Sequence, residues 1–210
     1  MYGIENYWLF IVTAFIFIMT PGIDTVFVLN KSISQGRKAG TYATMGINSG
    51  ILVHTLFAAL GLSILVAQSA LAFSIVKYLG ALYLIYLGVK GLFSKQEKLI
   101  VEKSSTNQKF SGDNYRAGLI TNVLNPKVAL FFLSFFPQFI RREFMETPIP
   151  FIILGLTYAA LGMIWFFGLS YFASIFSDRL KRSLKFNEYL NKFSSVVYIL
   201  MGIKIALTKK

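Results

Sequence analysis

Long apolar runs separated by short polar gaps fill most of this chain. A helix needs about 20 apolar residues to cross the hydrocarbon core of a bilayer, and six runs meet or approach that length. They are Tyr7–Leu29, Gly40–Val66, Phe73–Phe93, Ala117–Phe139, Ile149–Ile175 and Phe193–Leu207, the last being the shortest. The pattern predicts an all-α integral membrane protein with six transmembrane helices in a single domain over residues 1–210.

The two halves of the chain weakly resemble each other. "YLGVKGLF" ends the third run, "LMGIKIAL" ends the sixth, and the first and fourth runs each contain a proline. The polar stretch Ser94–Tyr115 separates the halves and is expected to be a flexible linker. Two tandem units of three helices must insert in opposite directions. We therefore expect two inverted repeats, about 1–93 and about 116–210, as in many secondary transporters.

Composition supports a membrane protein and accounts for its charge. The chain is 55% hydrophobic and only 14% charged, whereas about a quarter of the residues in soluble domains are charged. A net charge of +12 would suggest nucleic-acid binding in a soluble protein, but here the Lys and Arg residues gather after the first, third and fifth runs. The positive-inside rule makes those gaps cytoplasmic, which puts both termini outside and predicts no nucleic-acid partner.

The chain has no cysteine, and its single histidine cannot form a zinc centre alone. Disulfides and thiolate metal sites are thereby excluded, and we expect no cofactor and no metal site. The first basic residue, Lys31, follows the first apolar run, the reverse of the order in a cleaved signal peptide. We expect a retained first helix and a multi-pass protein of the bacterial cytoplasmic (inner) membrane, with a homodimer left open.

The segment "IMTPGIDTVFVLN" interrupts the first run with Pro21, Gly22 and Asp24. Proline removes a backbone donor, and glycine lets the backbone leave helical geometry. Freed backbone groups are tolerated in a membrane only where protein or a watery cavity covers them. The sequence therefore predicts a helix break that faces the interior of the bundle.

Asp24 is the one acid, out of nine, that lies within a predicted span. A carboxylate at that depth costs about 2.5–3.5 kcal/mol on insertion scales, so it implies a partner or a role. Two interpretations are compatible and both stay open. Asp24 caps the helix that restarts after the break, or it binds a substrate or a proton.

The fourth run contains a matching interruption, formed by Asn122, Asn125, Pro126 and Lys127. We expect the two breaks to meet near the middle of the membrane, with Asp24 as the partner of Lys127. A salt bridge that only holds the helices in register is the alternative. If the two breaks instead form a binding site, they would suit a zwitterion. The free backbone donors at the start of a half-helix attract a carboxylate, and Asp24 together with freed backbone carbonyls attracts an ammonium group.

The second run carries further polar candidates. Asn48 could contribute to the site, and His54 could relay protons, although a histidine hydrogen-bonded to a neighbouring helix is the more ordinary arrangement. Gly46 and Gly50 form a small-xxx-small pair, which more often serves close packing than ligand binding. Four aromatic residues could line a cavity, although packing is their usual role: Tyr83, Tyr86, Tyr158 and Trp165.

Three stretches carry a resemblance to a known family and together cover about half the chain. They are "TPGIDTVFVLNKSISQGRKAG" with the helix that follows it to Gly61, "YLGALYLIYLGVKGLF" (Tyr78–Phe93), and "FSGDNYRAGLITNVLNPKVALFFLSFFPQFI" (Phe110–Ile140). This sequence resembles the LysE/RhtB family of amino-acid exporters, whose signature combines PGP and Asp or Asn with a later NPK. Ile23 departs from that signature, which commonly has a second proline there.

The resemblance implies six helices and proton-coupled export of an amino acid or a derivative. Because Asp24 is the sole acid within a predicted span, we expect an alternating-access mechanism in which it binds a proton and the substrate ammonium in turn. The partners we expect are thus a small molecule, protons and the lipid bilayer. Metal-cation efflux is an alternative, but one intramembrane acid and one histidine make a poor cation cage. A lipid-handling protein or an intramembrane enzyme is a further alternative. A hydrolase is poorly supported, because it needs a nucleophile beside a base, and Ser49 and His54 face different sides of one helix.

Overall fold

The structure is a computed structural model that describes residues 2–62, 70–93 and 111–175, together with isolated residues at 192, 195–196, 199–200, 202–203 and 206–207. Within these ranges the chain is helical apart from its turns, and one antiparallel bridge joins Ile4 and Ile140. This is the all-α architecture that the apolar runs predict. About half of the sixth run, Phe193–Leu207, and residues 94–110 of the predicted linker lie outside the described residues.

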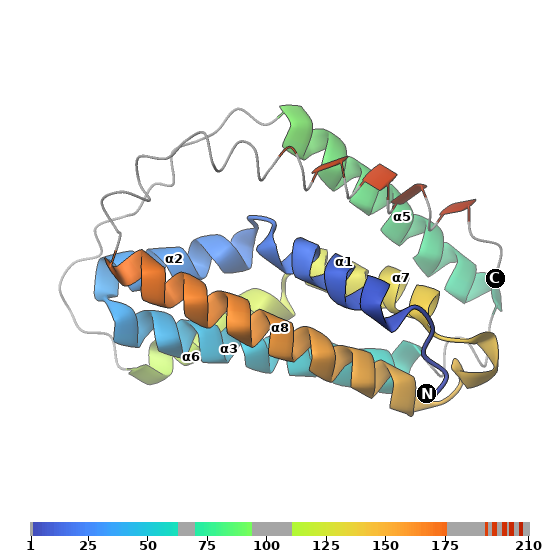
Figure 1. Cartoon of the computed structure of the whole chain (residues 1–210), viewed down its shortest axis with the longest axis horizontal. Coiled ribbons are helices and arrows are strands. Elements are labelled where there is room, and N and C mark those ends of the chain that lie inside the picture. Colours follow the sequence, from blue (N-terminus) through green and yellow to red (C-terminus); the bar gives the residue numbers. More distant parts are fainter. Residues whose placement is uncertain are drawn as a thin grey trace.

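The elements follow the predicted runs closely (Figure 1). They are α1 (Tyr7–Met19), α2 (Ile23–Gln35), α3 (Arg37–Phe57), the π-helix η1 (Ala58–Leu62), α5 (Ala70–Phe93), α6 (Ser111–Val123), α7 (Pro126–Phe135), the 3₁₀ turns η2 (Phe136–Phe139) and η3 (Arg142–Phe144), and α8 (Pro148–Ile175).

Two helices are long and apolar enough to cross a membrane, Arg37–Gly61 and Pro148–Ala173. Two more spans result if each bent pair counts as one: α1 with α2, bent by 55°, and α6 with Pro126–Phe139, bent by 49°. The bends lie at Pro21-Gly22 and at Asn125-Pro126, so the helices break where the sequence predicts. The described residues therefore give between two and four candidate spans rather than the full set of six.

Three boundaries differ from the prediction. Ser111–Tyr115 belongs to α6 and not to the linker, since Asp113 in the first turn suits the positive helix end. α2 continues to Gln35, which places Lys31 in a helix. The gap between α2 and α3 is then Gly36 alone, and its φ of 84° is one that glycine adopts readily.

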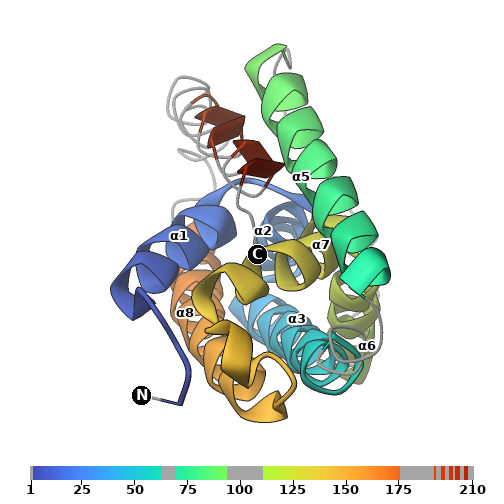
Figure 2. The ribbon, with the colours of Figure 1, turned by 90° about the vertical axis from the view of Figure 1, so that its right-hand side faces the viewer.

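α3 packs against α2, α6 and α8, and Figure 2 shows it between α6 and α8. Its contact with α6 is very close: a Cβ on Gly46 would overlap the carbonyl oxygen of Tyr115, and one on Gly118 would lie 2.5 Å from the carbonyl oxygen of Ala43. The packing role expected of Gly46 is therefore confirmed. α5 packs on α7, away from α8, as both views show.

The outward-facing side chains of the long helices are apolar. Trp8 on α1, Phe57 on α3 and Ile164 on α8 are all more than 60% exposed. The buried side chains are apolar too, with phenylalanines such as Phe10 and Phe131 fully enclosed. A chain that is apolar on both its interior and its exterior fits hydrocarbon as its surroundings.

Candidate functional site

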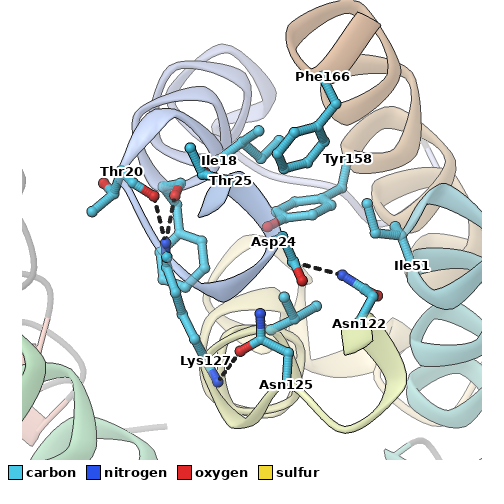
Figure 3. A pocket seen from close by; sticks show the side chains of 13 residues that line it. Ile18, Thr20, Asp24, Thr25, Ile51, Asn122, Asn125, Lys127, Tyr158 and Phe166 are labelled. Atoms are coloured by element: carbon cyan, nitrogen blue, oxygen red, sulfur yellow. Dashed lines mark hydrogen bonds between the residues drawn. The ribbon is translucent and has the colours of Figure 1, made fainter. Parts of the chain in front are cut away.

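The two helix breaks face each other across a small shared pocket. Of the nine site residues predicted from the sequence, five line this pocket: Gly22, Asp24, Asn122, Asn125 and Lys127. Pro21 and Pro126 lie in the breaks themselves, next to lining residues. The meeting of the two breaks, expected from their composition alone, is thus present in the fold (Figure 3).

The first break separates α1 from α2 without a side-chain cap. Gly22 is the N-cap of α2, in an extended conformation, and no side chain bonds the first turn there. The capping role considered for Asp24 is therefore wrong, because Asp24 lies inside the first turn of α2. A negative charge at that place still interacts favourably with the positive helix end.

Asp24 is bound from the other break. The side-chain amide of Asn122, on α6, donates to Asp24 Oδ2 at 2.8 Å. Asp24 is only 7% exposed, and within the described part of the chain its Oδ1 has no hydrogen-bond partner. Figure 3 shows the carboxylate pointing toward Asn122 across the pocket. Asn122 fixes one carboxylate oxygen, and the side chain of Asn125 also lies against the carboxylate.

The second break is capped by its own residues. Asn125 is the N-cap of α7, and its Oδ1 accepts from the backbone N–H of Lys127 at 3.0 Å. Pro126 occupies the first helical position, where a missing N–H costs nothing. The sequence Asn-Pro-Lys therefore both stops α6 and starts α7.

Lys127 reaches across to the first break. Its Nζ donates to the backbone carbonyl oxygens of Phe17, at 3.2 Å, and Thr20, at 3.0 Å. The expected partner, Asp24, attracts Lys127 electrostatically and accepts a hydrogen bond from Asn122, while Nζ itself donates to the backbone carbonyls. The reason is that the end of α1 offers carbonyls without helical partners, which a cation satisfies directly.

His54 and Asn48 are buried but do not line the pocket. Nε2 of His54 lies 3.0 Å from the backbone carbonyl of Asn122, which can only accept, so Nε2 carries the hydrogen. This is the ordinary inter-helix bond considered from the sequence. Among the described residues neither polar atom of the Asn48 side chain has a hydrogen-bond partner.

Several lining residues were not among the predicted set. Thr20 and Thr25 flank the first break, and their closeness to Pro21 in the sequence was an available signal. Tyr158 was weighed as a cavity candidate and lines the pocket, whereas Tyr83, Tyr86 and Trp165 are not among its lining residues. The other lining residues are apolar and carry no distinguishing sequence signal: Phe17, Ile18, Ile51, Val128 and Phe166.

Comparison with known proteins gives a consistent result. A family model described as LysE type translocator matches residues 15–209. A protein of Bacillus subtilis (strain 168) named uncharacterized membrane protein YrhP is 32% identical over 95% of this chain and 97% of its own length. No solved structure matches the chain significantly.

Two further relatives carry a functional name. A leucine efflux protein of Enterobacter sp. (strain 638) is 31% identical over 98% of this chain and 97% of its own length. A leucine efflux protein of Salmonella choleraesuis (strain SC-B67) is 37% identical over 74% of this chain and 73% of its own length. The family model and the Enterobacter match each cover both breaks and the pocket between them.

Proposed function

The chain belongs to the LysE type translocator family, and on that premise we propose that it exports amino acids or close derivatives across the bacterial cytoplasmic membrane. It is a multi-pass membrane protein, and a translocator family fits a transporter rather than the intramembrane enzyme considered above. The observation that carries the proposal is the buried carboxylate of Asp24 in a pocket between two helix breaks, where one of its oxygens has no hydrogen-bond partner among the described residues.

The polar side of the pocket suits both charged groups of an amino acid. Asp24 Oδ1 and Asn122 Oδ1 are buried acceptors without partners in the described structure, which fits an ammonium group. The first turn of α2, beginning at Gly22, has backbone donors with no side-chain cap, which fits a carboxylate. An amino acid placed between them would satisfy both sets of groups.

The remaining wall favours an aliphatic, uncharged side chain. Ile18, Ile51 and Val128 line the pocket together with the rings of Phe166 and Tyr158. A charged side chain placed against these residues would lose its hydration without a partner. Relatives named leucine efflux protein support the same class of substrate. We therefore place leucine and similar residues ahead of lysine, arginine or glutamate as substrates.

We propose that transport is coupled to protons and works by alternating access. Asp24 binds either a proton or the substrate ammonium, so that an incoming proton displaces the substrate outward. We propose that packed rings on the side where α1 begins form a cover for the pocket, since Phe10 lies 5.5 Å from Phe136 and 5.3 Å from Phe139 between centroids. Backbone bonds hold the N-terminal segment there, Glu5 N to Phe139 O at 2.8 Å among them. This cover must open for release.

A reciprocal contact supports the six-helix inverted repeat. A Cβ on Gly88 would lie 2.6 Å from the carbonyl oxygen of Ser195, and one on Gly202 would lie 2.7 Å from that of Ala81. Gly88 thus approaches Ser195, seven residues before Gly202, and Gly202 approaches Ala81, seven residues before Gly88. A two-fold relation between α5 and an antiparallel C-terminal helix produces this pattern, and Figure 1 draws the C-terminal residues alongside α5.

The test is Asp24→Asn in membrane vesicles loaded with labelled leucine. The variant is expected to lose the stimulation of export by a pH gradient, because the amide cannot carry the proton, while its amount in the membrane stays the same. Asp113→Asn is the matched control, since Asp113 is an exposed acid in the first turn of α6. Wild-type stimulation in Asp24→Asn would refute the coupling role, and a panel of labelled amino acids tests the substrate class.

A further inference from the structure

The break in the first span releases two backbone carbonyls at the end of α1. In a continuous helix the carbonyl of Phe17 would accept from the N–H of residue 21, but Pro21 has no N–H. Thr20 has the extended ψ of 123°, so its carbonyl leaves the helical ladder. Inside a membrane such carbonyls need another donor.

The donor is the ammonium group of Lys127, which lies among two carbonyls, an aromatic ring and a glycine at the end of α1. Nζ lies 3.2 Å from Phe17 O and 3.0 Å from Thr20 O, and 4.7 Å from the centroid of the Phe17 ring. A Cβ on Gly22 would lie 3.3 Å from Nζ, so glycine leaves room for the cation. Carbonyls, an aromatic face and the negative end of a helix all favour a positive charge here.

Groups of this kind bind metal ions in other transporters built on discontinuous helices, where unwound carbonyls and half-helix ends coordinate Na⁺. Here a side chain from the second break fills the position. We propose that Lys127 is a tethered replacement for a coupling metal ion: it assembles the first break without Na⁺ or K⁺, and its removal exposes a site for a monovalent cation.

The charges of the pocket agree with this assignment. Lys127 and Asp24 both line the pocket. When both are ionised their charges cancel, so a zwitterionic substrate enters a pocket with no net charge. A metal ion is not required to balance Asp24. Only the transport measurement below rests on the proposed function, because the binding measurement needs no substrate.

The test measures thermal unfolding of the purified full-length protein in NaCl, KCl and choline chloride at equal ionic strength. The wild type is expected to unfold at the same temperature in all three. Lys127→Ala is expected to unfold at a lower temperature in choline and to regain about 2–4 °C or more in Na⁺ or K⁺ with a saturable dependence. Lys127→Gln, which keeps most of the side-chain length, is expected to respond in the same direction. Lys127→Arg is expected to behave as the wild type.

The matched control is Lys90→Ala, which removes an exposed lysine that lies over the ring of Tyr86 on α5. It is expected to show no difference between Na⁺ and choline. The proposal is overturned if the wild type itself is stabilised by Na⁺ or K⁺ over choline, or if neither Lys127→Ala nor Lys127→Gln responds to them. Should both variants fail to purify, wild-type export that falls tenfold in choline medium would overturn it, and unchanged export would support it.

The two proposals fail in different ways. If the wild type exports no amino acid from loaded vesicles, the proposed function is wrong, yet the unfolding measurements still decide the role of Lys127. If export is normal and Lys127→Ala shows no cation response, only the tethered-cation proposal is wrong.

Discussion

At the α1–α2 break the chain provides no side-chain cap, whereas at the α6–α7 break Asn125 caps the helix that follows it. The first break is completed from outside: Asn122 binds the carboxylate of Asp24, and Lys127 binds the carbonyls that end α1. The first break therefore depends on residues of the second, whereas the second is capped by its own Asn125. Residues of the second break serve both breaks, so the second acts as a rigid support and the first as the part that is held.

This asymmetry has a consequence for transport. A break whose backbone groups are satisfied by its own residues stays in place when its neighbours move. A break whose groups are satisfied by another helix changes when that helix moves or when a ligand competes for the same donors. We therefore expect the α1–α2 pair to be the mobile partner, and substitutions that cut its links to the second break to have the largest effects.

The largest effect is expected from Asn122→Asp, which places a carboxylate where the amide now donates to Asp24 at 2.8 Å. Two acids then face each other in place of an acid and an amide donor, and the two cannot both be ionised at this distance without a large repulsion. Export from vesicles is expected to fall below detection. The exchange Asp24→Asn with Asn122→Asp restores the hydrogen bond with its roles reversed, so it should recover thermal stability but not export. Recovery of export would mean that the position of the acid is unimportant.

A smaller effect is expected from Gly50→Ala on α3. The added Cβ would lie 2.6 Å from Asn122 Oδ1 and 2.7 Å from its Cβ, so it pushes that side chain away from Asp24. A hydrogen bond to a charged group is worth about 1.5–3 kcal/mol, which corresponds to a roughly tenfold to hundredfold loss of export. Labelled efflux normalised to protein in the membrane measures this. Unchanged export would show that the bond between the breaks does not matter.

Asn125→Ala tests the break that caps itself. Losing the N-cap of α7 is expected to cost about 1 kcal/mol, seen as a lower unfolding temperature of the purified protein. Asn125→Ser retains a capping oxygen and should recover most of the difference. Because Lys127 still reaches α1, export at low temperature is expected to change less than in Gly50→Ala. A larger loss of export than in Gly50→Ala would contradict the one-directional dependence.

The smallest effect is expected from Gly112→Ala in α6, where an added Cβ meets nothing within 4 Å. Alanine favours the helix over glycine by about 0.5–1 kcal/mol, so the unfolding temperature should rise slightly and export should not change. This variant sets the baseline for Gly50→Ala, which makes the same substitution on a neighbouring helix. A marked loss of export would mean that α6 responds to substitution along its whole length.

The helices and the breaks could be predicted from the sequence because both depend on local chemistry. Apolar runs fix where helices form, and Pro21 and Pro126 each remove a backbone donor at a definite position. The polar residues near those prolines were identified for the same reason. The start of α6 was missed because Ser111–Tyr115 is polar, and a polar helix end outside the apolar run has no hydropathy signal.

The sequence by itself determined that two interrupted spans carry an acid, amides and a lysine, since an unpartnered charge or backbone group is too costly in hydrocarbon to place without a reason. Only the tertiary structure decided how these groups pair. Opposite charge favoured Asp24 with Lys127, yet Nζ donates its hydrogen bonds to the carbonyls released at the end of α1, and Gly50 leaves space for Asn122 to reach Asp24. Which donor meets which acceptor depends on how closely the helices pack, and no single segment of the chain encodes that.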